Sequence, residues 1–156
     1  MTSNQNLFWG SRLWKLIHTV CYCAPDIEFT KYHIQVYYYF FVYVIPRCIY
    51  CPRCVIHYKN MLVKYQFNCK SKDDLINFSI FLHNKVNVRL SKPQLLREEV
   101  DVLYQNKDEY IPDIVSLLKW YQNNIQYGSF SKQSFKILLI YLTKLIPSHF
   151  TYKNDN

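Results

Sequence analysis

The chain has 156 residues, half of them hydrophobic, which suits one domain with or without an appendage and leaves enough apolar surface for a core. Only two glycines and six prolines occur, which argues against a glycine-rich nucleotide loop and against a β-rich fold full of tight turns. The formal net charge of +8 is spread along the chain, so we expect a charged surface or a phosphate-bearing ligand and no nucleic-acid partner.

Two helices are predicted in the first third of the chain. The first covers Trp9–Tyr22 and stops at Ala24-Pro25-Asp26. The second covers Thr30–Val44, is apolar nearly all round and therefore central or at an interface, and is expected to end at Pro46. Its β-branched and aromatic part, Val36–Ile45, is also compatible with a strand, but we favour a helix because no partner strand is in sight.

Two more helices are predicted in the middle of the chain. One begins near Pro52, since proline suits the first helical turn, and runs to about Phe67. The next has a start at Ser71 and Asp74 that resembles a capping box, and it reaches about Leu90.

Three further helices complete an all-α chain. A short one is predicted at Arg97–Tyr104, followed by Ile111 to about Gln126 with Gly128 as its C-cap. Ser131 is expected to cap the last helix, which is apolar at every third or fourth position. We expect the tail after His149 to be disordered.

Six cysteines occur in a chain for which we expect no signal peptide and no membrane insertion. The start is polar, and the longest apolar run, Val36–Pro46, is too short to cross a bilayer. These features predict a cytoplasmic protein. Cysteines in such a chain indicate metal binding or redox chemistry rather than a structural disulfide scaffold.

The densest motif is Cys48-Ile-Tyr-Cys51-Pro-Arg-Cys54-Val-Ile-His57, in which two Cys-x-x-Cys pairs overlap. Such a pair at a helix start suits dithiol–disulfide exchange, because the helix dipole and free N–H groups stabilise the first thiolate. Three cysteines and a histidine at this spacing also resemble the ligands of a zinc or iron–sulfur site. Inert buried thiols are the third alternative.

Two further motifs contain aromatic and basic residues. In His83-Asn-Lys-Val-Asn87-Val-Arg89-Leu-Ser-Lys92-Pro, the histidine and Asn87 share a helix face, so a flat base could stack on the ring while Asn87 reads its edge. Arg89 and Lys92 suit a pyrophosphate, although a charged helix end is the simpler explanation. The other motif, Trp9-Gly10-x-x-x-Trp14-x-x-x-His18, on its own indicates core packing.

Together, the three segments resemble the Erv/ALR family of FAD-linked sulfhydryl oxidases over about residues 7–104. The family pattern is Trp-Gly-x-x-x-Trp-x-x-x-His, then Cys-x-x-Cys-x-x-His, then His-Asn-x-Val-Asn-x-Arg/Lys-Leu-x-Lys-Pro. The compact form is more similar to the oxidases of large DNA viruses, which would place the protein in the host cytoplasm or the virion. The resemblance implies a bundle of four main helices with a short fifth over residues 1–104. Residues 105–156 have no counterpart in the family pattern, and from their two apolar stripes we expect a helical extension for packing or dimerisation.

The resemblance also implies the site. A substrate dithiol attacks Cys51, Cys54 passes the electrons to FAD, and oxygen becomes hydrogen peroxide, with no metal involved. The substrate is a protein dithiol or a thioredoxin-like shuttle, and the first two helices form a homodimer contact. The residues expected to bind FAD are Gly10, Arg12, Trp14, His18, Cys54, His57, His83, Asn84, Val86, Asn87, Leu90, Lys92 and Tyr104.

The chain departs from the family pattern in its other cysteines. Tyr50 stands where the family usually has proline, so a Cys48–Cys51 pair stays an alternative. No cysteine follows Cys69, which we expect to be a free thiol, and a separate shuttle pair is missing unless Cys21-Tyr-Cys23 serves. Two other functions stay open: a zinc or iron–sulfur binding module, and a catalytically inactive scaffold.

Overall fold

The computed structural model describes residues 3–125 and 130–151, and every regular element in these ranges is a helix. The predicted all-α class is therefore confirmed. One cluster of buried apolar side chains extends from Trp9 in the first helix to Ile146 after the last. The core thus includes the C-terminal extension as well as the part of the chain that carries the motifs.

The first helix, α1 (Ser3–Tyr22), lies between two others. It contacts α5 (Lys72–Arg89) and α7 (Ile111–Asn124). The side chains of Leu16 and Val20 are therefore fully buried. The helix ends where the sequence predicted, although it begins at Ser3 rather than Trp9.

The second predicted helix is one helical column made of three elements. These are α2 (Lys31–Tyr39), the π-helical turn η1 (Phe40–Val44) and α3 (Ile45–Cys48). The strand considered for Val36–Ile45 is thus excluded. The prediction that Pro46 ends this element is wrong, because the column continues to Cys48.

The π turn lets the helix pass through Pro46. The N–H of Ile45 bonds to the carbonyl of Phe40, five residues back, which is the π-helical pattern. Pro46 has no N–H to give to the next carbonyl in that pattern, Phe41. The hydroxyl of Tyr58 donates to this carbonyl instead, at 2.9 Å, so the buried oxygen keeps a partner.

The third predicted helix is α4 (Pro52–Lys64), which is shorter than expected. Phe67 lies beyond its end and packs its ring against Phe41 and Phe78, with ring centroids 5.7 and 5.5 Å apart. The packing of this partly buried ring against the edge of the core accompanies the end of the helix before Phe67.

The next helix starts as predicted and is followed by a short one. The side chain of Ser71 accepts a hydrogen bond from the N–H of Asp74 at 3.1 Å, which caps α5. The short helix, α6, covers Arg97–Leu103, within the predicted range.

The extension contains a 3-10 turn, η2 (Lys107–Tyr110), then α7 and α8 (Lys132–Leu145). Ser131 caps α8 as predicted, since its side chain accepts from the N–H of Ser134 at 3.1 Å. The prediction of disorder after His149 is wrong for Phe150, which packs against the core and whose N–H bonds to the carbonyl of Ile146 at 3.2 Å. The C-cap predicted at Gly128 and the tail from residue 152 onward lie outside the described residues.

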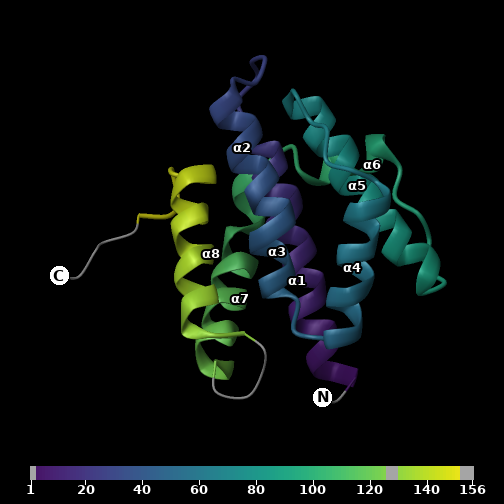
Figure 1. Cartoon of the computed structure of the whole chain (residues 1–156), viewed down its shortest axis with the longest axis vertical. Helices are drawn as coiled ribbons and strands as arrows, with labels where there is room; N and C mark the ends of the chain where they lie inside the picture. Colours follow the sequence, from purple (N-terminus) through teal and green to yellow (C-terminus); the bar gives the residue numbers. More distant parts are fainter. Residues whose placement is uncertain (1–2, 126–129, 152–156) are drawn as a thin grey trace.

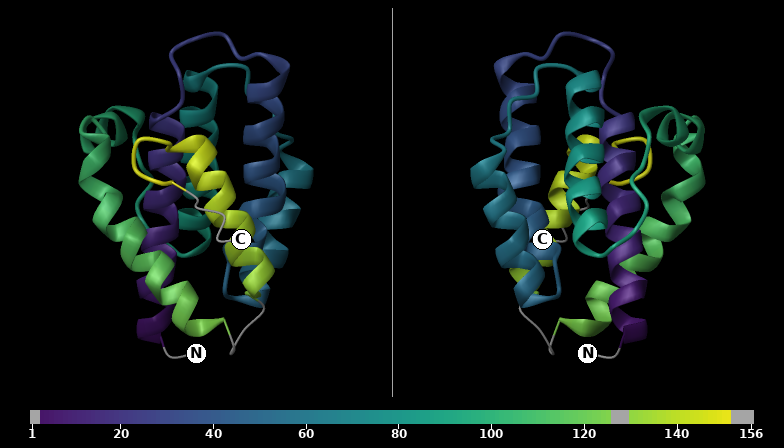
Figure 2. Two further views of the ribbon diagram at one scale, coloured as in Figure 1. Left: turned by 90° about the vertical axis from the view of Figure 1, so that its left-hand side faces the viewer. Right: turned by 90° about the vertical axis from the view of Figure 1, so that its right-hand side faces the viewer.

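The extension lies along one side of the bundle. Figure 1 shows α7 and α8 on one side of the α2–α3 column, with α4, α5 and α6 on the other side. In Figure 2, α8 lies in front of the bundle in the left view and behind it in the right view. In addition to the contact of α7 with α1, α8 packs on η1 and α3. Among the described helices, none is long and apolar enough to cross a membrane.

Candidate functional site

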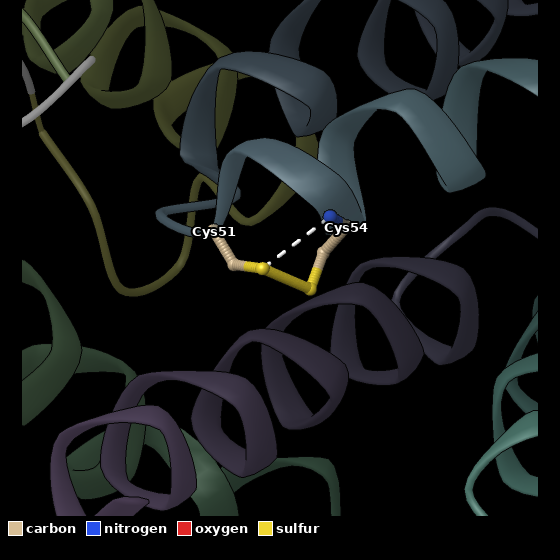
Figure 3. The surroundings of a disulfide bond; sticks show 2 residues. All are labelled: Cys51 and Cys54. Carbon is tan, nitrogen blue, oxygen red and sulfur yellow. Dashed lines mark hydrogen bonds between the residues drawn. A yellow bond between two sulfur atoms is a disulfide. The ribbon is translucent and has the colours of Figure 1, made fainter. Parts of the chain in front are cut away.

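A disulfide joins Cys51 and Cys54 at the start of α4, with Cα atoms 5.2 Å apart. Cys51 is the N-cap residue, and its sulfur accepts a hydrogen bond from the N–H of Cys54 at 3.3 Å (Figure 3). Both side chains are partly exposed, and the first turn of α4 contains no acidic residue. Because a helix N-terminus favours negative charge, a thiolate at Cys51 is stabilised when the disulfide opens.

The residues just before Cys51 are held by the extension. The buried hydroxyl of Tyr121, on α7, donates to the carbonyl of Cys48. The hydroxyl of Tyr50 donates to the carbonyl of Asn124 at 2.8 Å, and its ring meets Trp120 edge-on with centroids 4.9 Å apart. The segment that leads into the disulfide is therefore anchored to α7 through both its backbone and a side chain.

Aromatic side chains from α1 and α5 form a stack. The rings of Trp14 and His83 are nearly parallel, with centroids 4.1 Å apart and planes 3° apart. His18 lies 5.2 Å from His83, and Tyr104 packs on His18 at 5.4 Å. A flat ring inserted between Trp14 and His83 would need the two rings to be about 7 Å apart, which is two contact distances. A base would therefore stack on an outer face of the pair, or the two rings would have to move apart.

A chain of hydrogen bonds fixes the protons of both histidines. Ser79 donates its one hydroxyl hydrogen to the carbonyl of Ile76 at 2.8 Å, so it can only accept from Nδ1 of His18, which is 3.0 Å away. Nε2 of His18 is then an acceptor, and Nδ1 of His83, 2.9 Å away, must donate to it. It follows that Nε2 of His83 carries a lone pair.

The electrostatics keep these two imidazoles neutral. Burial, together with the neighbouring His83, lowers the pKa of His18 to about 3. Burial and the positive charge of Lys92 lower the pKa of His83 to about 4. Both pKa values lie well below 7, so each ring is neutral at pH 7 and carries one N–H, as the hydrogen-bond chain above assumes.

The end of α5 brings Lys92 close to this stack. The N–H of Lys92 bonds to the carbonyl of Asn87 at 2.8 Å, and the N–H of Ser91 bonds to Val88 at 3.1 Å, which is a Schellman motif. Ser91 adopts the left-handed φ of 54° that this motif needs. Asn87 is 7% exposed, and its side-chain amide makes no hydrogen bond to a described residue and is not sealed from solvent, so it is available to a ligand.

Two predicted residues have partners within the protein. Asn84 makes two hydrogen bonds to the backbone of Leu95, at 2.7 and 2.9 Å, and so holds the segment after α5. Arg12 lies 3.5 Å from Asp113 of α7, which also pairs with Lys15 at 2.8 Å.

The remaining predicted residues are more loosely placed. A Cβ atom at Gly10 would meet nothing within 4 Å, so packing among the described residues does not demand glycine there. Val86 packs at the edge of the core, whereas Leu90 is 55% exposed. Burial and the charge of Arg89 lower the pKa of His57, which lies one turn after Cys54.

The sequence reasoning missed Ser79 and Tyr22. Ser79 lies one turn before His83, and Tyr22 lies one turn after His18, so helical spacing from the two histidines could have found both. Tyr22 stacks on Tyr104 at 5.2 Å, and its hydroxyl donates to Asp101 at 2.6 Å. Both residues therefore belong to the walls of the stack.

The other four cysteines are free thiols. Cys21, Cys48 and Cys69 are buried, and Cys23 is partly exposed. Burial raises the pKa of Cys69 to about 12 and raises those of the other three thiols as well. These thiols are therefore poor nucleophiles at neutral pH. No group of three His, Cys, Asp or Glu side chains that could hold a metal ion occurs among the described residues.

Comparison with known proteins gives one match. The family model described as the Erv1 / Alr family matches residues 11–105, which include the disulfide, the aromatic stack and the end of α5. No curated protein and no solved structure matches the chain. The match stops just before η2, so α7 and α8 lie outside it.

Proposed function

Because the chain belongs to the Erv1/Alr family, we propose that it is an FAD-dependent sulfhydryl oxidase, which forms disulfides in dithiol substrates and passes the electrons to oxygen, giving hydrogen peroxide. The observation that carries the proposal is the Cys51–Cys54 disulfide at the N-terminus of α4. Cys51 and Cys54 are partly exposed, whereas Cys21, Cys48 and Cys69 are buried free thiols with raised pKa values.

The residues around the aromatic stack fit FAD. The neutral Trp14–His83 pair has flat faces for the adenine, and the unpartnered amide of Asn87 can bond to the edge of the base. Lys92 and Arg89 supply positive charge for the pyrophosphate. The isoalloxazine ring would lie beside Cys54.

Other residues would support the cofactor. We propose direct contacts for Gly10, His18, His57, Val86, Leu90 and Tyr104. Asn84 and Arg12 would act indirectly, since their side chains hold Leu95 and face Asp113.

The thiol chemistry follows from the placement of the two cysteines. A substrate thiolate attacks the sulfur of Cys51, the bond to Cys54 breaks, and Cys54 leaves as a thiolate stabilised by its helical position. The second substrate thiolate attacks the substrate sulfur of the mixed disulfide and releases Cys51. The substrate has then lost two electrons, and Cys51 and Cys54 are both reduced. FAD, when bound, would accept two electrons from this dithiol and hand them to oxygen.

We propose a structural role for residues 105–156. The extension anchors the segment before Cys51 through Tyr121 and Asn124. Its helices α7 and α8 pack on α1 and α3, so it would cover the oxidase core or enlarge a homodimer contact. Sedimentation of the whole chain tests the dimer, which remains a proposal.

The visible spectrum of the purified protein tests the function. We expect a yellow protein with a flavin spectrum that dithiothreitol bleaches without oxygen and that air restores with release of hydrogen peroxide. In the Cys51→Ser and Cys54→Ser variants, dithiothreitol should not bleach the flavin at the native rate. A folded, colourless protein that takes up no FAD on reconstitution would overturn the proposal.

A further inference from the structure

A groove runs between the α2–α3 column on one side and α4 with the segment that follows it on the other. It consists of two adjoining hollows of about 800 and about 320 Å³. Tyr38 and Phe67 line both hollows, and their rings meet edge-on with centroids 5.9 Å apart. We call this feature the α2/α4 groove.

The walls of the larger hollow are mainly apolar. Val42 and Pro46 line it from the column, and Leu62 and Val63 line it from α4. Val63 is 77% exposed and the neighbouring Tyr43 is 45% exposed. Apolar side chains that gather in an exposed hollow are typical of a surface that binds a partner.

All the charged side chains that line the groove are positive. Arg47 and Lys59 line the larger hollow, and Lys31 and Lys70 line the smaller one. None of the described residues that line either hollow is acidic, and none of these four cations forms an ion pair with a described residue. The charge complement of this groove is therefore an acidic partner. A second copy of this chain, with a net charge of +8, is a poor fit.

Residues on both walls of the larger hollow are near Cys51 along the chain: Arg47 precedes it by four residues and Lys59 follows it by eight. Lys59 and Leu62 belong to a stripe of α4 that recurs every three or four residues and begins with Cys51 and Val55. On the opposite wall, Arg47 lies in α3, the element that leads directly into the Cys51 segment. A chain that lies in the groove can therefore bring its own cysteines to Cys51.

We infer that the α2/α4 groove docks an acidic segment with apolar side chains, contributed by the protein dithiol that Cys51 and Cys54 oxidise. This inference rests on the proposed function. The cations set the sign of the partner, and the apolar walls hold its Leu, Phe or similar side chains.

The docking of an acidic segment is tested by comparing how fast the protein oxidises two reduced peptides that share the same Cys-x-x-Cys core. One has flanking Glu, Asp, Leu and Phe residues, and in the other each acid is replaced by Lys. The native protein should oxidise the acidic peptide with the higher kcat/KM. Arg47→Glu with Lys59→Glu should lower that kcat/KM by about tenfold, since each exposed ion pair contributes up to about 1 kcal/mol. Turnover of dithiothreitol should not change, and added salt should reduce the difference.

The matched control is Lys119→Glu with Lys136→Glu, which makes the same charge change at exposed positions of α7 and α8. Equal kcat/KM for both peptides, or an equal loss in the control, would overturn the inference. So would a single-stranded oligonucleotide that binds at the groove more tightly than the acidic peptide. A version of the acidic peptide with Ser in place of each Cys cannot be oxidised. Its binding, measured by fluorescence polarisation, tests docking in the groove separately from thiol oxidation. Failure of the proposed function is recognised separately, by a lack of dithiothreitol oxidation.

Discussion

Nε2 of His18 lies 2.9 Å from Nδ1 of His83, so a hydrogen bond between two neutral imidazoles joins α1 to α5. The direction of this bond is set by Ser79, which already donates to Ile76 and can only accept from His18. The two helices that would hold the cofactor are thus linked by a series of hydrogen bonds through Ser79, His18 and His83, and one assignment of the protons satisfies all of them.

Ser79→Ala should disturb both histidine tautomers. Nδ1 of His18 loses its acceptor, so we expect a mixture of tautomers in the ¹⁵N NMR spectrum of the imidazoles and FAD affinity weaker by about fivefold, from a lost hydrogen bond of about 1 kcal/mol. Ser134→Ala, at a buried serine of α8, is the matched control. Unchanged imidazole spectra in the Ser79 variant would contradict the proton assignment.

The free energy of unfolding should fall on acidification below pH 6.5. In the folded protein, burial lowers the pKa of His83 to about 4 and that of His18 to about 3, against 6.5 without burial. The unfolded chain therefore binds protons first, so the stability that is complete above pH 6.5 is lost as the pH falls toward 4 and then 3. For His18 the loss is on the order of a few kcal/mol.

Urea unfolding between pH 7.5 and about pH 4 measures this dependence. His83→Phe keeps a ring for stacking on Trp14 but cannot titrate, so its stability should vary less with pH. An equally steep dependence in this variant would show that other groups cause the loss.

Cys51→Ser and Cys54→Ser should each abolish turnover, whereas Cys48→Ser should keep most of it. Cys51 would be the sulfur that the substrate attacks, and Cys54 the one that reduces the cofactor. Cys48 is buried, unpaired and of raised pKa. Oxygen consumption with dithiothreitol measures all three variants. An inactive Cys48→Ser together with an active Cys54→Ser would mean that Cys48 and Cys51 form the redox pair.

Tyr121→Phe should show that the extension positions the segment before Cys51. The carbonyl of Cys48 would lose its donor in a buried place, which costs about 1–3 kcal/mol of stability. We also expect a changed rate of iodoacetamide alkylation at Cys51 in the reduced protein, measured against pH. Tyr141→Phe, on α8, is the control. If Tyr121→Phe lowers stability but leaves the alkylation profile of Cys51 unchanged, the tyrosine has only a packing role.

The sequence by itself determined the helical class, most helix boundaries and the chemical motifs. Helix-start signals such as Ser71, Ser131 and Pro52 are local, so they can be recognised without the fold. The stacking residues Trp14 and His83 could also be found from the sequence. Each belongs to a motif that lies within one helix, so its spacing can be recognised without the fold.

Only the tertiary structure decided how these parts act on one another. The path of the helix through Pro46 depends on a hydroxyl from Tyr58, twelve residues away in the sequence. The proton arrangement of His18 depends on Ser79, and the hold on the Cys51 segment depends on Tyr121, far along the chain. Periodicity reports which face of a helix is buried, but hydrogen bonds between distant residues arise only when packing places donor and acceptor within about 3 Å of each other.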